Sequence, residues 1–134
     1  MSALCEAAEN GDINELRRLI DDRADVQARD ETGFTALMWA AMRGHVDCVQ
    51  LLIDANAALD TRAPDGVTAL IWAVMLGRIA CSRLLIEAKA NLEIQDHDGR
   101  TAFLRAAASG QSECAQMLMD AKADVAVGHT RGVT

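Results

Sequence analysis

Apolar and polar residues follow a helical period along the chain, and glycines interrupt that period at regular intervals. In residues 33–45, which read GFTALMWAAMRGH, the apolar Leu37, Ala40 and Ala41 fall on one face at helical spacing. Thr35 precedes this run as a candidate N-cap, and Gly44 follows it as a residue that tolerates the left-handed conformation at a helix end. The pattern therefore predicts a short helix between Thr35 and Gly44.

A second apolar run begins immediately after this glycine. Residues 46–55 place Val49, Leu52 and Ile53 on one side of a second helix. The Asp- and Gly-containing stretch at 30–33 predicts a turn before the first helix. The order is therefore turn, helix, turn, helix and loop.

This unit recurs with a period of 33 residues, because Gly33, Gly66, Gly99 and Gly132 are equally spaced. Two other positions recur with the same spacing of 33 residues. One holds the threonines Thr35, Thr68, Thr101 and Thr134, and the other holds a second glycine at Gly11, Gly44, Gly77 and Gly110. Two helices of about ten residues bury too little surface alone, so neighbouring units must stack into a continuous core.

The segments TALMWA, TALIWA and TAFLRA resemble the T-P-L-H-x-A signature of the ankyrin repeat, whose unit is a β-turn followed by two helices. The resemblance implies an all-α ankyrin-repeat solenoid forming a single domain over residues 1–134. We expect repeats at about 1–29, 30–62, 63–95 and 96–127, here called units one to four, with the start of a truncated further repeat at 128–134. Unit one lacks its turn.

Some positions depart from the family pattern. The signature proline and histidine are replaced, at Ala36, Ala69 and Ala102 and at Met38, Ile71 and Leu104 respectively. We therefore expect apolar contacts where imidazoles would form a polar ladder. The glycine that ends the second helix is Arg23, Asn56, Lys89 and Lys122. Where such residues must adopt a positive φ, Arg or Lys costs on the order of 1 kcal/mol that glycine avoids, which predicts modest stability.

The charge of the chain disfavours two classes of partner. A net charge of −7 repels phosphate backbones and anionic membranes, so we expect no nucleic acid and no membrane partner. The apolar runs are too short to span a bilayer, and MSALCEAAENGD turns acidic too early for a signal peptide. We expect an intracellular, cytoplasmic location, with the nucleus left open.

Four cysteines raise the question of a metal site or a disulfide. Cys48, Cys81 and Cys114 lie one period apart at a core-facing register, and stacked helices lie farther apart than a disulfide allows. We expect buried free thiols there, and Cys5 as the most exposed thiol. The histidines have no partner at metal or catalytic spacing, so we assign no catalytic, cofactor or metal site and expect no enzyme activity.

The surface remains as the functional candidate. In the ankyrin family the turn tips and the exposed side of the first helix form a concave face that receives partners. At those positions stand Phe34, Trp39, Met42, Arg43, Val67, Trp72, Met75, Leu76, Arg100 and Arg105. Grouped apolar residues on a charged protein indicate a binding patch. For Trp39 and Trp72 we favour packing between first helices over partner contact, and for the two arginines solvation over an acidic partner.

We therefore expect a non-catalytic module that binds a partner protein or peptide on this face. Two alternatives stay open, namely a targeting or regulatory segment of a larger enzyme or signalling protein, and a structural spacer within a longer array. Weak self-association through the C-terminal face is a further expectation.

Overall fold

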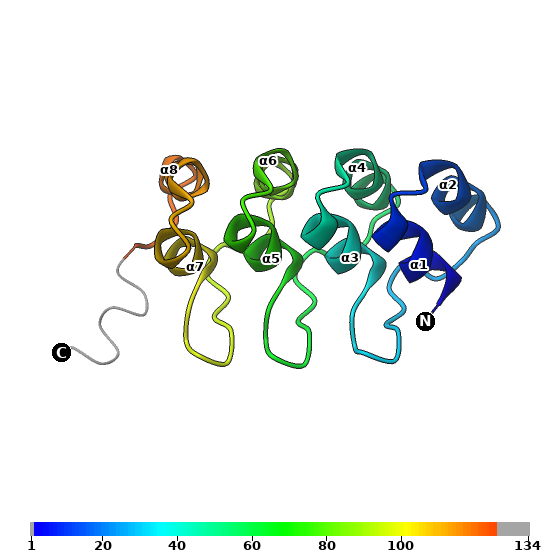
Figure 1. Ribbon diagram of the computed structural model, residues 1–134, viewed down its shortest axis with the longest axis horizontal. Coiled ribbons are helices and arrows are strands. Elements are labelled where there is room, and N and C mark those ends of the chain that lie inside the picture. The colour runs from blue at the N-terminus through cyan, green and yellow to red at the C-terminus, as the bar shows by residue number, and fades with distance from the viewer. Residues whose placement is uncertain (1, 126–134) are drawn as a thin grey trace.

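The computed structural model describes residues 2–125, in which the chain forms eight α-helices in two rows (Figure 1). The first helices of the units are α1 (Ala3–Asn10), α3 (Ala36–Arg43), α5 (Ala69–Met75) and α7 (Ala102–Ala108). The second helices are α2 (Ile13–Asp21), α4 (Val46–Asp54), α6 (Ile79–Glu87) and α8 (Ser112–Asp120). Each helix packs against its partner in the same unit and against the same helix of the neighbouring unit. The predicted all-α solenoid is confirmed.

The exact repeat bounds and the single-domain assignment stay predictions. The start of the further repeat at 128–134 lies outside the described residues, as does the end of unit four. Among the helices of residues 2–125, none is both long and apolar enough to cross a membrane.

Caps define the ends of the first helices. The Thr35 hydroxyl accepts a hydrogen bond from the Met38 N–H at 3.3 Å, and Ser2 caps α1 in the same way through the Cys5 N–H. Gly44 ends α3 with a φ of 79°. These bonds satisfy backbone groups that a helix end leaves unpaired, so the short first helices start and stop where the sequence predicts.

The turns project from the row of first helices (Figure 1). We call residues 30–33, 63–66 and 96–99 the turn tips. In each turn tip the N–H of the last glycine donates a hydrogen bond to the carbonyl of the first residue. In the first turn tip this bond joins the Gly33 N–H to the Asp30 carbonyl at 2.9 Å. The turn tips and the exposed sides of the first helices thus belong to the same side of the stack.

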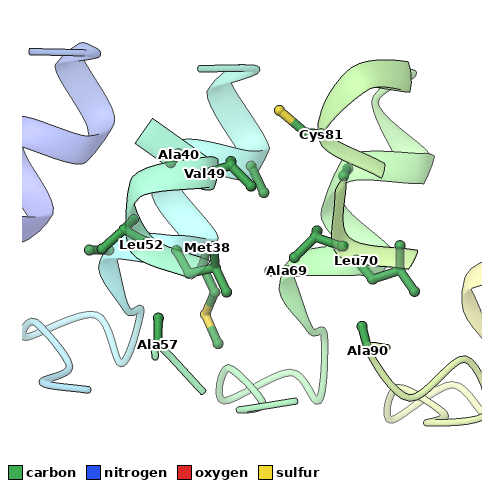
Figure 2. Packing of buried hydrophobic residues seen from close by; sticks show 14 of the residues in the cluster. Met38, Ala40, Val49, Leu52, Ala57, Ala69, Leu70, Cys81 and Ala90 are labelled. Atoms are coloured by element: carbon green, nitrogen blue, oxygen red, sulfur yellow. The ribbon is translucent and has the colours of Figure 1, made fainter. Parts of the chain in front are cut away.

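The core is made of small and aliphatic side chains. Ala40 and Leu52 are fully buried, as are the residues one and two periods later, Ala73, Ala106, Leu85 and Leu118. Figure 2 shows Met38, Val49 and Leu52 among the buried side chains that α3 and α4 contribute to the core. Small alanines let the helices approach closely, which explains how a chain with so few aromatic residues fills its interior.

Side chains also connect consecutive units. Gln27 donates to the Asn56 carbonyl at 2.8 Å and accepts from the Ala58 N–H at 2.7 Å. Asp60 and Glu93 stand in the same register and accept from the backbone of the following unit, at the N–H groups of Asn91 and Asp124. On the other edge, the His45 ring bonds to the Glu9 carbonyl at 2.9 Å. These bonds fix the spacing of the stack.

The positive backbone angles expected after the second helices are present. Arg23, Asn56, Lys89 and Lys122 have φ values of 69°, 64°, 74° and 72°. Arg23, Lys89 and Lys122 place a Cβ in a region that favours glycine, so these three carry the cost predicted above, whereas asparagine tolerates the region better.

All four cysteines are free and buried. This confirms the expectation for Cys48, Cys81 and Cys114, but the expectation of an exposed Cys5 is wrong. Cys5 shares its register with Met38 and Ile71, whose side chains are both buried, and its Sγ lies 3.7 Å from the Phe34 carbonyl oxygen. Burial raises the pKa of the Cys48 and Cys81 thiols to about 11, so neither is a nucleophile near neutral pH.

Candidate interaction surface

Apolar side chains are exposed near the ends of α3 and α5, on the first helices. Leu76 is 42% exposed, and Met42 and Met75 are half-buried. The exposed part of the Leu76 side chain keeps its apolar surface in contact with water and so contributes nothing to folding. These three residues are the apolar centre of the side proposed from the sequence.

Trp39 has a structural role that its position alone does not reveal. Its indole N–H donates to Asp30 Oδ2 at 2.8 Å. The other oxygen of Asp30 accepts from the N–H groups of Thr32 and Phe34 at 2.9 and 3.1 Å. One carboxylate therefore closes the turn tip and ties it to α3, which supports the packing interpretation of this tryptophan.

Phe34 brings the two tryptophans together. Its ring centroid lies 5.1 Å from that of Trp39 and 6.0 Å from that of Trp72. Tilted pairs at these distances are favourable. The three rings form an aromatic cluster across units two and three, and each ring keeps a partly exposed edge.

Trp72 lacks the bond that holds Trp39. The register of Asp30 is occupied by Ala63 in unit three, and Trp72 Nε1 is buried with no hydrogen-bond partner among the described residues. In this turn Asp65 instead accepts from the Val67 N–H at 3.2 Å. The turn is thus closed by a different side chain, and the indole donor remains unpaired.

Arg105 takes the place of the tryptophan in unit four and is held internally. Its Nε donates to Asp96 Oδ2 at 2.7 Å, and its Nη2 lies 2.9 Å from Asp98 Oδ2. Burial raises the pKa of Asp96, but hydrogen bonds from the Arg100 N–H and the Arg105 side chain outweigh it, so that pKa is lowered. Arg105 is therefore paired within its own unit, which corrects the expectation of a freely solvated side chain and leaves it less suited to an acidic partner.

The remaining candidate residues differ in how much of their side chain a partner could contact. Val67 is only 6% exposed and offers almost no surface to a partner. Arg43 pairs with Glu9 at 2.8 Å and lies over the Trp39 ring at 5.8 Å, yet half of its side chain is exposed. Arg100 is exposed at a turn. Val67 and Arg105 consequently leave the candidate set, and the other eight residues stay.

Within residues 2–125 no group of three His, Cys, Asp or Glu side chains could hold a metal ion. A depression of about 270 Å³ lies between α6 and α8, and its lining residues include Arg83, Ile86 and Met117. It is on the row of second helices, away from the candidate surface.

Comparison with known proteins agrees with the repeat pattern. A family model described as ankyrin repeats in many copies matches residues 4–53, and one described as ankyrin repeats in three copies matches residues 55–128. A search of curated proteins gave no match. Ankyrin repeats are in general protein-interaction modules without catalytic activity. Matched over nearly its whole length, the chain belongs to the ankyrin repeat family.

Proposed function

We propose that the side formed by the turn tips and first helices of units two and three binds a protein or peptide without covalent chemistry. The observation that carries the proposal is the exposure of Leu76 beside the half-buried Met42 and Met75 on a protein of net charge −7. Exposed apolar groups on such a charged chain are typical of interaction sites. The proposed contacts are Phe34, Trp39, Met42, Arg43, Trp72, Met75, Leu76 and Arg100.

Rigid presentation is the proposed mechanism. Asp30 holds the first turn tip to Trp39, and Phe34 packs against both tryptophans. A partner therefore meets side chains whose conformations are already fixed, which lowers the entropy lost on binding. Apolar groups of the partner would cover Met42, Met75 and Leu76, and Arg43 would contribute the exposed part of its guanidinium.

The test compares the original chain with a Met42→Ala/Met75→Ala/Leu76→Ala variant in affinity capture from cell lysate. The matched control is Met119→Ala, because Met119 is 49% exposed but lies on α8 in the row of second helices. We expect proteins that the original and the control retain and that the triple variant loses. Circular dichroism checks that the variants keep their helices.

Trp72 is left unchanged in this experiment because its ring packs on Phe34, so a loss of binding could reflect a local change of fold. Retention of every captured protein by a folded triple variant would contradict the proposed site. An array that captures nothing would instead favour a structural spacer.

A further inference from the structure

The row of second helices carries a depression that the proposed partner surface does not include. We call it the α6–α8 groove, and its volume is about 270 Å³. Pockets that enclose whole drug-sized ligands usually measure roughly 300–1,000 Å³. The groove therefore suits one long side chain of a partner better than a cofactor. It is lined by Arg83, Ile86, Glu87, Met117, Asp120 and Ala121.

The less exposed residues of this lining are apolar. Ile86 and Met117 are partly buried and pack against the hydrophobic core. Such a surface suits the methylene groups of a lysine or arginine, which cover apolar atoms while the charged end of the side chain stays in water.

The exposed residues of the lining carry an excess of negative charge. Glu87 and Asp120 are both exposed, one on each helix of the groove. Gln116 donates to Asp120 Oδ1 at 2.9 Å, but a neutral amide leaves the charge of the carboxylate in place. Within residues 2–125 no salt bridge reaches Glu87 or Asp120. Both carboxylates can therefore accept a cation from outside the chain.

Arg83 is the one cation in the lining, and it has a carboxylate of its own. Its Nη2 lies 3.9 Å from Glu113 Oε2, and both side chains are exposed. An exposed pair at this distance contributes little. Arg83 thus offsets Glu113 and leaves the other two carboxylates without a counter-charge.

Carboxylates recur along the row of second helices. Asp54 precedes Glu87 and Asp120 by one and two periods, and Gln50 donates to Asp54 at 2.8 Å as Gln116 does to Asp120. Packed helices lie about 8–10 Å apart. Because an α-helix advances about 1.5 Å per residue, cations about seven residues apart on a partner helix match that interval.

We propose that the α6–α8 groove binds a basic helical segment of a partner protein. One lysine or arginine of the segment lies with its methylene groups on Ile86 and Met117 and with its charge at Glu87 and Asp120. An acidic segment would be repelled, and a purely apolar one would cover the carboxylates without pairing them, which is costly. This occupant is thus selected by the charge of the groove together with its apolar lining.

The test measures binding of a labelled helical peptide by fluorescence anisotropy. The peptide has about 21 residues of alanine and glutamine, with a lysine at every seventh position, and is long enough to form a helix in water. We expect saturable binding that disappears when glutamine replaces the lysines. Glu87→Gln and Asp120→Asn should each weaken binding by about two- to fivefold, as expected for an exposed ion pair.

A stronger variant places a cation of the chain itself in the groove. Met117→Lys should weaken peptide binding by about tenfold or more, because its ammonium group competes for the same carboxylates. The matched control is Met119→Lys, which adds the same charge to α8 at a residue that is 49% exposed and outside the lining. Circular dichroism checks that both variants keep their helices. If Met117→Lys unfolds, Glu87→Gln is compared with Glu6→Gln, an exposed glutamate on α1.

Binding that Met117→Lys and Met119→Lys reduce equally would reflect the net charge of −7 and would overturn the proposal. So would the absence of saturable binding, or equal affinities for Glu87→Gln and Glu6→Gln. The Met42→Ala/Met75→Ala/Leu76→Ala variant should bind the peptide like the original chain, because none of its positions lines the groove. Loss of peptide binding in that variant would place the peptide on the other surface and also overturn the proposal.

Discussion

The indole N–H of Trp39 donates to the carboxylate of Asp30 over 2.8 Å, and this bond joins a turn tip to a first helix. One period later the tryptophan is kept as Trp72, but Ala63 replaces the acceptor and the indole nitrogen is buried without a partner. A buried unpaired donor costs about 1–3 kcal/mol. Two units with nearly the same sequence pattern thus differ in how well their turns are held.

Ala63→Asp should stabilise the array, because it restores the acceptor that unit two contains. We expect the free energy of unfolding to rise by about 1–3 kcal/mol in urea titrations. The control repeats the substitution in a Trp72→Phe background, where the gain should be smaller. An equal gain in both backgrounds would assign the effect to the turn backbone and not to the indole.

Removing the indole nitrogen should have unequal effects on stability in the two units. Trp39→Phe leaves Asp30 without one of its donors, whereas Trp72→Phe removes a donor that has no acceptor. We expect Trp39→Phe to cost more than Trp72→Phe by about 1–3 kcal/mol, measured by thermal and urea unfolding. Equal losses would show that ring packing against Phe34 dominates at both sites.

Acid should weaken the array through Asp96. Because its pKa in the folded chain lies below the ordinary value of 3.8, its contribution is complete above that value and is lost as the pH falls through the folded pKa. Asp96→Asn should therefore flatten the fall in unfolding free energy below about pH 4. Asp98→Asn is the matched change at an exposed carboxylate beside the same arginine, and it should keep most of the fall. Identical curves for Asp96→Asn and the original would contradict this role.

Glycine should be the better residue at Lys89, whose φ is 74°. Lys89→Gly should raise the unfolding free energy by up to about 1 kcal/mol, because glycine adopts this angle without steric strain. The neighbouring Ala88 has a φ of −79°, so Ala88→Gly should lower it by about 0.5–1 kcal/mol. If both variants shift the stability in the same direction, backbone strain at Lys89 is not the cause.

Helices, caps and strained helix ends could be predicted because each depends on residues a few positions apart. The period also indicated the burial of Cys5, because its register is the one that Met38 and Ile71 occupy in the core. The bonds of Trp39 to Asp30 and of Arg105 to Asp96 both span nine residues. That shared spacing was a signal in the sequence, although only side-chain geometry shows which atoms meet.

Contacts between units were harder to predict because their residue types vary within one register. Gln27, Asp60 and Glu93 all bond to the backbone of the following unit, yet an amide and two carboxylates give no common motif. Exposure also depends on neighbouring side chains. Val67 and Leu76 are equally apolar in the sequence, but only Leu76 is exposed.

The bonds that link the units have a kinetic consequence. Gln27 reaches Asn56 across 29 positions, and Arg78 reaches the Met42 carbonyl across 36. Each such contact closes a loop of about one repeat, so the entropic cost of closing it hardly changes along the chain. Folding can consequently begin at any pair of adjacent units and spread to the next, which predicts a low contact order and rapid folding.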